Sequence, residues 1–285
     1  QAQTIIADLL SRVGSPRRPI SSPNASPTPK DTLALGQISR EGTEWTGAYP
    51  SGLAGLEVLN LRQMLARSWR DTRLSALWSM LIYPFNSDLA LIRLFADLET
   101  SFDSWDRLSR ERGTFGFLGT DAGIPSSVLG LTVKAPSYQK LFGLASNHVL
   151  LRTELTGEYE SDRRKILTAI QEGQTYFAFD TLGQTKGFAA WYEDQRGIQS
   201  LGARIPLNSN GRILVRLPKK PSVPFEIVIL RDSMNVMTSN STTTEYRTLQ
   251  SGVYRVVVRL FIRSTLFDGG RWIPWIMTNP ITVTP

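Results

Sequence analysis

The sequence predicts an α/β region followed by a small antiparallel β-sandwich. Up to about residue 200, apolar strand-like runs alternate with segments of helical periodicity, which is typical of a parallel sheet or barrel. Beyond that point, alternating β-branched segments are separated by turns and have no helix between them, as in a sandwich. We therefore expect two domains, an α/β region over residues 1–200 and a β-sandwich over residues 201–285.

The first region alternates helices and strands. Its helices are expected where apolar residues recur every three or four positions, and its strands where short apolar runs end in polar residues. In chain order we expect a helix over 4–13, a proline-rich loop over 15–31, a strand over 55–60, helices over 61–78, 87–98 and 101–112, and a strand over 115–119.

A helix over 162–173 and an aromatic strand over 175–180 complete the first region. Alternation along that strand places Tyr176 and Ala178 on one face and Phe177 and Phe179 on the other, which predicts a strand that is covered on both sides. The sandwich strands are then expected over 212–217, 225–230 and 253–262 and in the closing segment 272–285.

Composition limits the possible functions. The 285 residues are 41% hydrophobic and 20% charged, as in ordinary globular proteins. The net charge is +7, but short basic pieces such as residues 163–165 and the pair Lys219 and Lys220 are interpreted as solvated surface, so nucleic acid is not an expected partner.

The cysteine count bears on chemistry and location. Because there is no cysteine, disulfides and thiolate metal sites are excluded, and the chain is compatible with an exported (periplasmic) or a cytoplasmic protein. No apolar run is long enough to predict a transmembrane helix.

Four polar residues are candidates for a site. Asp121 follows the strand over 115–119, at the position where α/β enzymes keep ligands for metals or substrates, although it could instead cap the following turn. Glu57, within the strand over 55–60, is a weak candidate metal ligand or else a partly buried glutamate paired with a nearby arginine. Asn60, at the end of that strand, is a weak candidate substrate-binding residue or else closes the strand end. His148 is the one histidine of the chain, and we interpret it as structural.

Several phrases of the sequence together resemble one family. LEVLN (56–60), WDRLSRERGTFGFLGTDAG (105–123), SNHVLLRTELTG (146–157), ILTAIQEGQTYFAFDTLGQTKGF (166–188) and WIMTNPITV (275–283) are similar, in this order, to the later part of the PHP (polymerase and histidinol phosphatase) family. The similarity is to its metal-dependent phosphoesterase-like members, which carry a β-sandwich after the catalytic domain.

The resemblance implies a partial or distorted β/α barrel whose strand ends hold divalent metals, such as zinc, manganese or iron. Such metals activate water against phosphate esters. The family's Asp-Ala-His matches Asp121, Ala122 and Gly123, so the carboxylate is present and the imidazole is absent. A His-Pro turn of the family would fall near Ser22 and Pro23, again without histidine, and its opening His-x-His has no counterpart in this chain.

Two functions follow as expectations. The first is a metal-dependent phosphoesterase acting on a phosphate-ester small molecule, degenerate or incomplete because most of the metal-binding histidines are missing. In that case, the chain is the later portion of a longer protein or has lost its metals. The alternative is a non-catalytic binding or scaffold module that recognises a protein or a glycan.

Overall fold

We describe a computed structural model of the chain, which covers residues 33–35, 39–40, 43–44, 49, 53–60, 79, 83, 90–91, 103–120, 127–128, 131–132, 138–263 and 270–285. The expected helices over 4–13 and 61–78 and the proline-rich loop lie outside these residues. So do Ser22, Pro23 and Asp121. Of the helix expected over 87–98, residues 90–91 are described, and they are helical.

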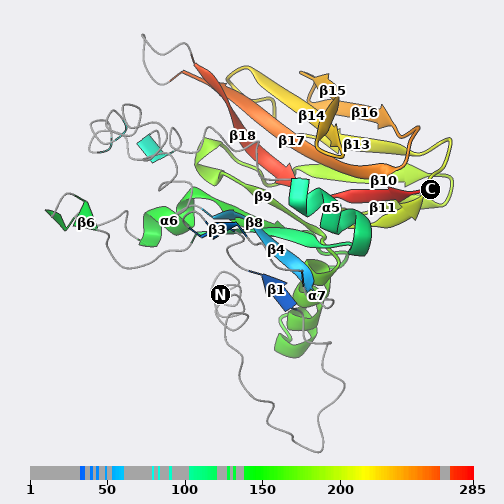
Figure 1. Ribbon diagram of the computed structural model, residues 1–285, viewed down its shortest axis with the longest axis horizontal. Helices are drawn as coiled ribbons and strands as arrows, with labels where there is room; N and C mark the ends of the chain where they lie inside the picture. The colour runs from blue at the N-terminus through cyan, green and yellow to red at the C-terminus, as the bar shows by residue number, and fades with distance from the viewer. Residues whose placement is uncertain are drawn as a thin grey trace, which may run out of the picture.

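Two sheets form a β-sandwich at the upper right of Figure 1. The large sheet has eight strands and is antiparallel except for the parallel pair β12 and β19. Its strands are β8 (Ser146–Val149), β9 (Thr175–Ala178), β12 (Arg204–Pro206), β14 (Phe225–Arg231), β15 (Met234–Ser239), β17 (Gly252–Ile262), β18 (Arg271–Thr278) and β19 (Ile281–Thr284). The small sheet is antiparallel, and its strands are β10 (Ala189–Asp194), β11 (Gly197–Gln199), β13 (Arg212–Arg216) and β16 (Thr243–Arg247).

The sandwich core lies between these two sheets. Alternate residues of β13 and β14 point inward, so that Ile213 and Val215 of the small sheet and Ile227 and Ile229 of the large sheet belong to one buried cluster. Each of these four side chains is at most 1% exposed. Burial of apolar surface on this scale is the main force that holds two sheets together. The predicted β-sandwich is therefore confirmed.

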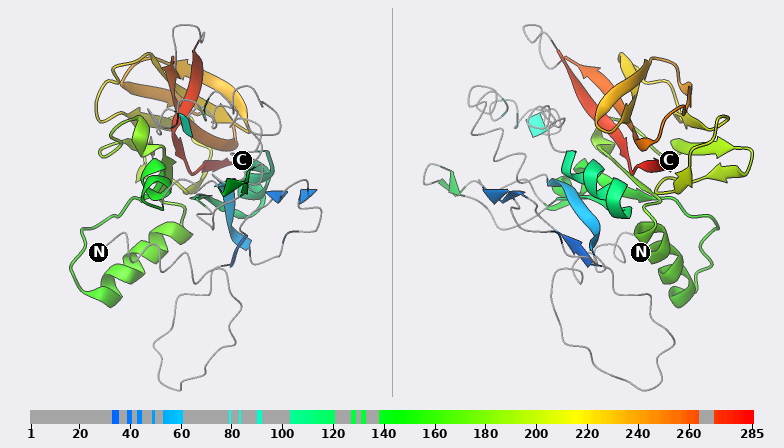
Figure 2. Two further views of the ribbon diagram at one scale, coloured as in Figure 1. Left: turned by 90° about the vertical axis from the view of Figure 1, so that its left-hand side faces the viewer. Right: turned by 45° about the vertical axis from the view of Figure 1, so that its right-hand side comes forward.

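A third layer covers the other face of the large sheet. It contains a parallel sheet of β1 (Leu33–Leu35), β4 (Leu53–Asn60) and β5 (Phe115–Gly119), together with helix α5 (Asp103–Arg112). Leu56 of β4 and Trp105 of α5 are fully buried in a second core with Phe177 and Met277 of the large sheet. The large sheet is thus the middle of three layers, as the two views in Figure 2 show.

The prediction of a β/α barrel is wrong. The described residues are mostly strands, with the three α-helices α5, α6 (Tyr138–Leu144) and α7 (Tyr159–Gln171), and their sheets form no closed barrel. The alternation of strands and helices gave the wrong class because it does not say which strands pair. After α7 the chain does not return to the parallel sheet, since β9 pairs antiparallel with β18.

The aromatic strand β9 confirms a different prediction. Tyr176 and Ala178 contribute to the sandwich core, and Phe177 and Phe179 contribute to the core on the opposite face. The boundary near residue 200 stays a prediction. Strands β8 and β9 precede it, yet they are hydrogen-bonded into the sheet whose other strands follow it.

A buried ion pair joins α5 to the large sheet. Arg255 of β17 pairs with Asp106 of α5, and their side chains are 1% and 5% exposed. The hydroxyl of Ser233 also donates to Asp106, at 2.6 Å, and the Arg255 guanidinium lies 3.8 Å above the Trp105 ring. Burial raises the pKa of the Asp106 carboxyl, and the nearby Arg255 charge acts against that rise. These contacts make α5 an integral part of the fold.

The remaining short elements are the 3₁₀ helix η2 (Asp180–Leu182) and the hairpins of β2 (Ser39–Arg40) with β3 (Thr43–Glu44) and of β6 (Ser127–Val128) with β7 (Leu131–Thr132). Within the ranges described above, no helix combines the length and the apolar character needed to cross a bilayer.

Candidate functional site

The structure brings two of the predicted site residues together. Glu57 and Asn60 lie in β4, and the Asn60 amide donates a hydrogen bond of 2.9 Å to Glu57 Oε1. The Glu57 carboxylate occupies the space above Gly119 of the neighbouring strand, because a Cβ atom at Gly119 would lie 1.7 Å from Glu57 Oε1. Asp121 follows Gly119 by two residues but lies outside the described residues.

This pair offers little metal chemistry in the described structure. A catalytic divalent ion needs about three protein ligands, and Glu57 and Asn60 supply one carboxylate and one amide oxygen. No group of three or more His, Asp or Glu side chains gathers anywhere in the described ranges. The divalent-metal site implied by the family resemblance therefore stays a prediction.

His148 lies in β8, and its side chain takes part in a polar cluster on the same face of the large sheet as Tyr176 of the sandwich core. Its Nε2 atom lies 3.0 Å from Asp180 Oδ1, and Asp180 also accepts hydrogen bonds from the hydroxyls of Ser146 and Thr185. The imidazole stacks on the Tyr176 ring, with centroids 4.6 Å apart. Burial alone would raise the pKa of Asp180, but hydrogen bonds from His148, Ser146 and Thr185 hold that pKa below its ordinary value of 3.8.

The cluster around His148 is better suited to structure than to nucleophilic catalysis. A serine nucleophile must donate its proton to the imidazole, whereas the Ser146 hydroxyl donates to the Asp180 carboxylate. The side chains of His148 and Asp180 are 28% and 29% exposed, so the pair is half-buried at the edge of the sheet. These contacts agree with the interpretation of His148 as a structural residue.

A groove beside α7 is the strongest candidate for a binding site. The helix begins at Tyr159, three residues before its expected start, and it projects below the sandwich in Figure 1. Asp162 holds the segment that leads into the helix by accepting backbone hydrogen bonds from Thr156 and Gly157 at 2.8 and 2.7 Å. The backbone bond from Thr156 is the main reason that the pKa of Asp162 is lowered.

The end of α7 is equally well defined. The Gly173 N–H donates to the Ile170 carbonyl and the Gln174 N–H donates to the Ala169 carbonyl, which is the Schellman arrangement. Gly173 has φ of +68°, a value that glycine adopts without strain. The turn places Gln174, which follows the helix, beside Leu150 in the segment that precedes it. The Leu150 N–H donates to the Gln174 carbonyl at 2.8 Å.

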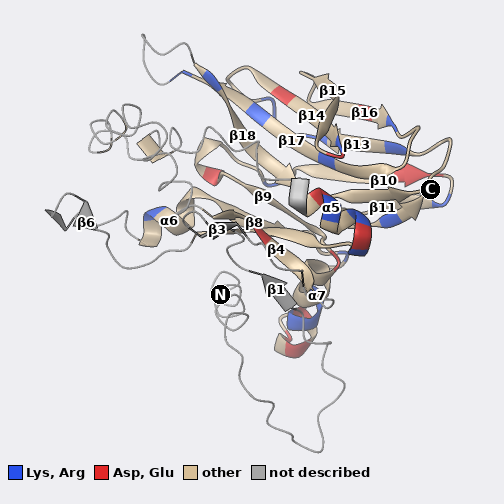
Figure 3. Cartoon of the chain, viewed as in Figure 1, with Lys and Arg blue, Asp and Glu red and all other residues tan. Residues whose placement is uncertain are grey.

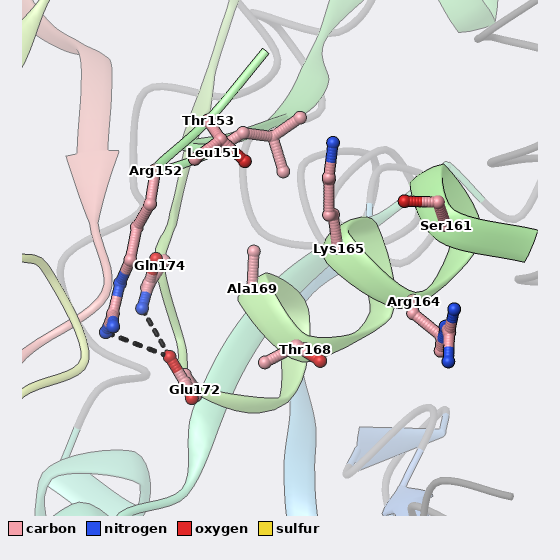
Figure 4. Close-up of a pocket in the computed structure, with 10 residues that line it drawn as sticks. All are labelled: Leu151, Arg152, Thr153, Ser161, Arg164, Lys165, Thr168, Ala169, Glu172 and Gln174. Carbon is pink, nitrogen blue, oxygen red and sulfur yellow. Dashed lines mark hydrogen bonds and ion pairs between the residues drawn. The ribbon is translucent and has the colours of Figure 1, made fainter. Parts of the chain in front are cut away.

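The groove opens between α7 and the segment 151–153 that follows β8. Its volume is about 400 Å³. Figure 4 shows Lys165 extending from the helix beside Thr153 and Ser161, and Arg152 and Gln174 converging on Glu172. The lining residues are Leu151, Arg152, Thr153, Ser161, Arg164, Lys165, Thr168, Ala169, Glu172 and Gln174.

The charges that line the groove are mainly positive. Three cations, Arg152, Arg164 and Lys165, stand against the single carboxylate of Glu172. Arg152 pairs with Glu172 at 3.2 Å, and Lys165 donates to the Glu154 carbonyl at 2.8 Å and lies 3.5 Å from Asp162. An ammonium group carries three donors, so Lys165 keeps the capacity to bind an anion.

The sequence alone does not predict the groove. Its basic run over residues 163–165 indicates solvated surface, and nothing in the linear pattern connects this run with Arg152. The connection depends on the Schellman turn and on the pairing of β8 with β9, which fold the two segments together. A basic run on an amphipathic helix was the available signal, but such runs occur on many helices.

No family model, no curated protein and no solved structure matches this chain. The resemblance to the PHP family stays a prediction, and the barrel that it implied is not present in the described residues.

Proposed function

We propose that this chain is a binding module that holds a small anionic ligand, of the phosphate-ester kind, in the groove beside α7. The observation that supports this proposal is the lining of the groove, which includes three cations and one carboxylate. Phosphate groups are bound in proteins by such cations together with hydroxyl and backbone donors.

Each part of the lining has a role in this proposal. Lys165 and Arg152 supply positive charge from the two sides of the groove, and the hydroxyls of Thr153 and Ser161 donate to phosphate oxygens. Arg164 stands at the rim, where its Nε donates to the Glu160 carbonyl at 3.2 Å. Figure 4 shows its side chain extending away from the segment 151–153, so Arg164 attracts the ligand over a longer distance.

Calorimetric titration with inorganic phosphate and with phenyl phosphate tests the proposal. We expect measurable binding of both, and we expect Lys165→Gln to weaken it about tenfold, since one charge-assisted hydrogen bond contributes about 1.5–3 kcal/mol. The matched control is Arg163→Gln, because Arg163 does not line the groove and lies 3.9 Å from Glu160. Equal binding by wild type and Lys165→Gln would refute the assignment of the site.

The same preparations separate binding from hydrolysis. p-Nitrophenyl phosphate with added manganese or zinc reports phosphoesterase activity directly. If wild-type protein turns over this substrate, the metal-dependent phosphoesterase becomes the better description. Binding of phenyl phosphate without turnover supports the binding module.

A further inference from the structure

One end of the β-sandwich carries four cations that pair with no carboxylate among the described residues, and we call it the basic end: Lys186, Arg216, Lys219 and Lys220. All four side chains are exposed. Lys186 precedes β10, Arg216 ends β13, and the two neighbouring lysines lie in the connection from β13 to β14. Three separate positions along the chain thus contribute to one surface.

Contacts in the backbone bring these positions together. Gly187 packs against Pro218, since a Cβ atom at Gly187 would lie 3.3 Å from Pro218 Cβ. Lys186 directly precedes Gly187 in the chain, and Lys219 directly follows Pro218. Arg216 pairs across the small sheet with Ala189 of β10, three residues after Lys186. The four cations therefore belong to the same end of the small sheet.

The two ends of the small sheet differ in charge balance. At the opposite end, Arg212 lies 3.1 Å from Glu245 and 3.5 Å from Glu193, and Arg196 lies 2.6 Å from Asp194. Acidic and basic segments are accordingly mixed at that end, beside the chain's C-terminus in Figure 3.

At the basic end, Arg216 has Ala189 and Thr243 as its neighbours across the sheet. No carboxylate among the described residues pairs with any of the four cations. Glu226, at the start of the next strand β14, is paired with Arg259 at 2.8 Å. The positive charge of the basic end is therefore left uncompensated within the described chain.

We propose that the basic end binds an anionic lipid surface. Three of its four cations are lysines, which are compact charges on flexible stems and do not require a partner of fixed geometry. Protein interfaces are depleted in lysine and are built around aromatic and arginine anchors. Single-stranded nucleic acid is bound by combining cations with stacking aromatic rings, and the nearby rings of Phe188 and Phe225 are buried in the sandwich core. A surface of dispersed negative charge suits this composition best.

Pro218 and Pro221 flank the two central lysines and strengthen the argument. Proline has a fixed φ angle, so the backbone of this turn has fewer conformations to lose when its side chains meet a surface. The attraction adds up over the cations and is screened by salt, so the association is expected to be reversible and sensitive to ionic strength.

Vesicle co-sedimentation tests this proposal with the full chain. The probes are vesicles of phosphatidylcholine alone and vesicles of phosphatidylcholine with about one third phosphatidylserine. We expect binding to the second kind only, and we expect the double variant Lys219→Gln with Lys220→Gln to reduce partitioning at least about tenfold. Raising the salt to about 0.5 M should also release the protein.

The control variant combines Arg107→Gln with Arg163→Gln, which removes the same charge from an exposed and a partly buried position elsewhere. It should bind the anionic vesicles as wild type does. Absence of vesicle binding by wild type, or equal loss in both double variants, would overturn the proposal. Binding of a fluorescent DNA duplex but not of the vesicles would overturn it as well and would assign the surface to nucleic acid.

This test is independent of the groove beside α7. The variant Lys219→Gln with Lys220→Gln should keep wild-type affinity for phenyl phosphate, and Lys165→Gln should keep wild-type binding to anionic vesicles. Failure of one proposal is thus distinguishable from failure of the other.

Discussion

Asn279 binds the backbone of Gly116 through both ends of its side-chain amide. The Gly116 N–H donates to Asn279 Oδ1 at 2.6 Å, and Asn279 Nδ2 donates to the Gly116 carbonyl at 3.0 Å. Asn147 makes the same pair of bonds with Leu118, at 2.9 and 2.8 Å. Two side chains of the sandwich thus take the place of a neighbouring strand along β5 and connect the parallel sheet to the large sheet.

Asn279→Ala should destabilise the fold by about 2–4 kcal/mol, because it leaves the buried N–H and carbonyl of Gly116 without their partner. Urea unfolding followed by circular dichroism measures this loss. Asn210→Ala is the control, since Asn210 is exposed and its replacement should change stability by less than about 0.5 kcal/mol. Equal stability of the two variants would show that the amide bonds do not anchor β5.

Gly202→Ala should also destabilise the protein. Gly202 has φ of +79°, and a Cβ atom there would lie 1.8 Å from the Glu172 carbonyl oxygen, in the Schellman turn that ends α7. We expect a loss of more than about 1 kcal/mol in thermal or urea unfolding, since both conformation and space oppose a side chain.

The matched substitution Gly143→Ala should increase the stability of the protein instead of lowering it. Gly143 lies within α6 with open space around its Cβ position, so alanine should stabilise the helix by up to about 1 kcal/mol. A destabilised Gly143→Ala variant would contradict this description of α6.

Asp180 should make the free energy of unfolding depend on pH in the acid range. Its folded pKa is lower than the ordinary value of 3.8, so its contribution is fully present above that value and is lost as the pH falls through the folded pKa. The comparison is between wild type and Asp180→Asn in urea at a series of pH values. The wild type should be more stable near neutral pH, and the difference should shrink in the acid range below about pH 4. A difference that does not vary with pH would contradict the assigned pKa.

Local structure was predictable where a short pattern is sufficient. The spacing of apolar residues determines which face of an element can be buried. It therefore predicts the strands β4 and β5, the helices α5 and α7 and both faces of β9. The pairing of strands was not predictable in the same way. The sequence that suggested a barrel contains no signal that β9 joins β18, nearly a hundred residues later.

The candidate sites likewise combine contacts that the sequence indicates with contacts that only the fold creates. The sequence places Glu57 within one strand and Asn60 at its end, and the structure shows them in contact. Arg152 and Lys165 were not connected by any spacing, and they face one groove because the turn after α7 reverses the chain. Arg216 and Lys186 likewise come together only through the pairing of β10 with β13.

By itself the sequence determined some of the elements, the alternation of buried faces in β9, the presence of a β-sandwich and the lack of cysteine chemistry. These properties depend on residues that are close in the chain, where backbone geometry connects neighbours directly. The tertiary structure alone decided that the strands form three layers instead of a barrel, that two asparagines bind β5 and that cations gather in a groove and at one end of the sandwich. Each of these results depends on contacts between distant segments, whose partners are selected by the packing of the whole core.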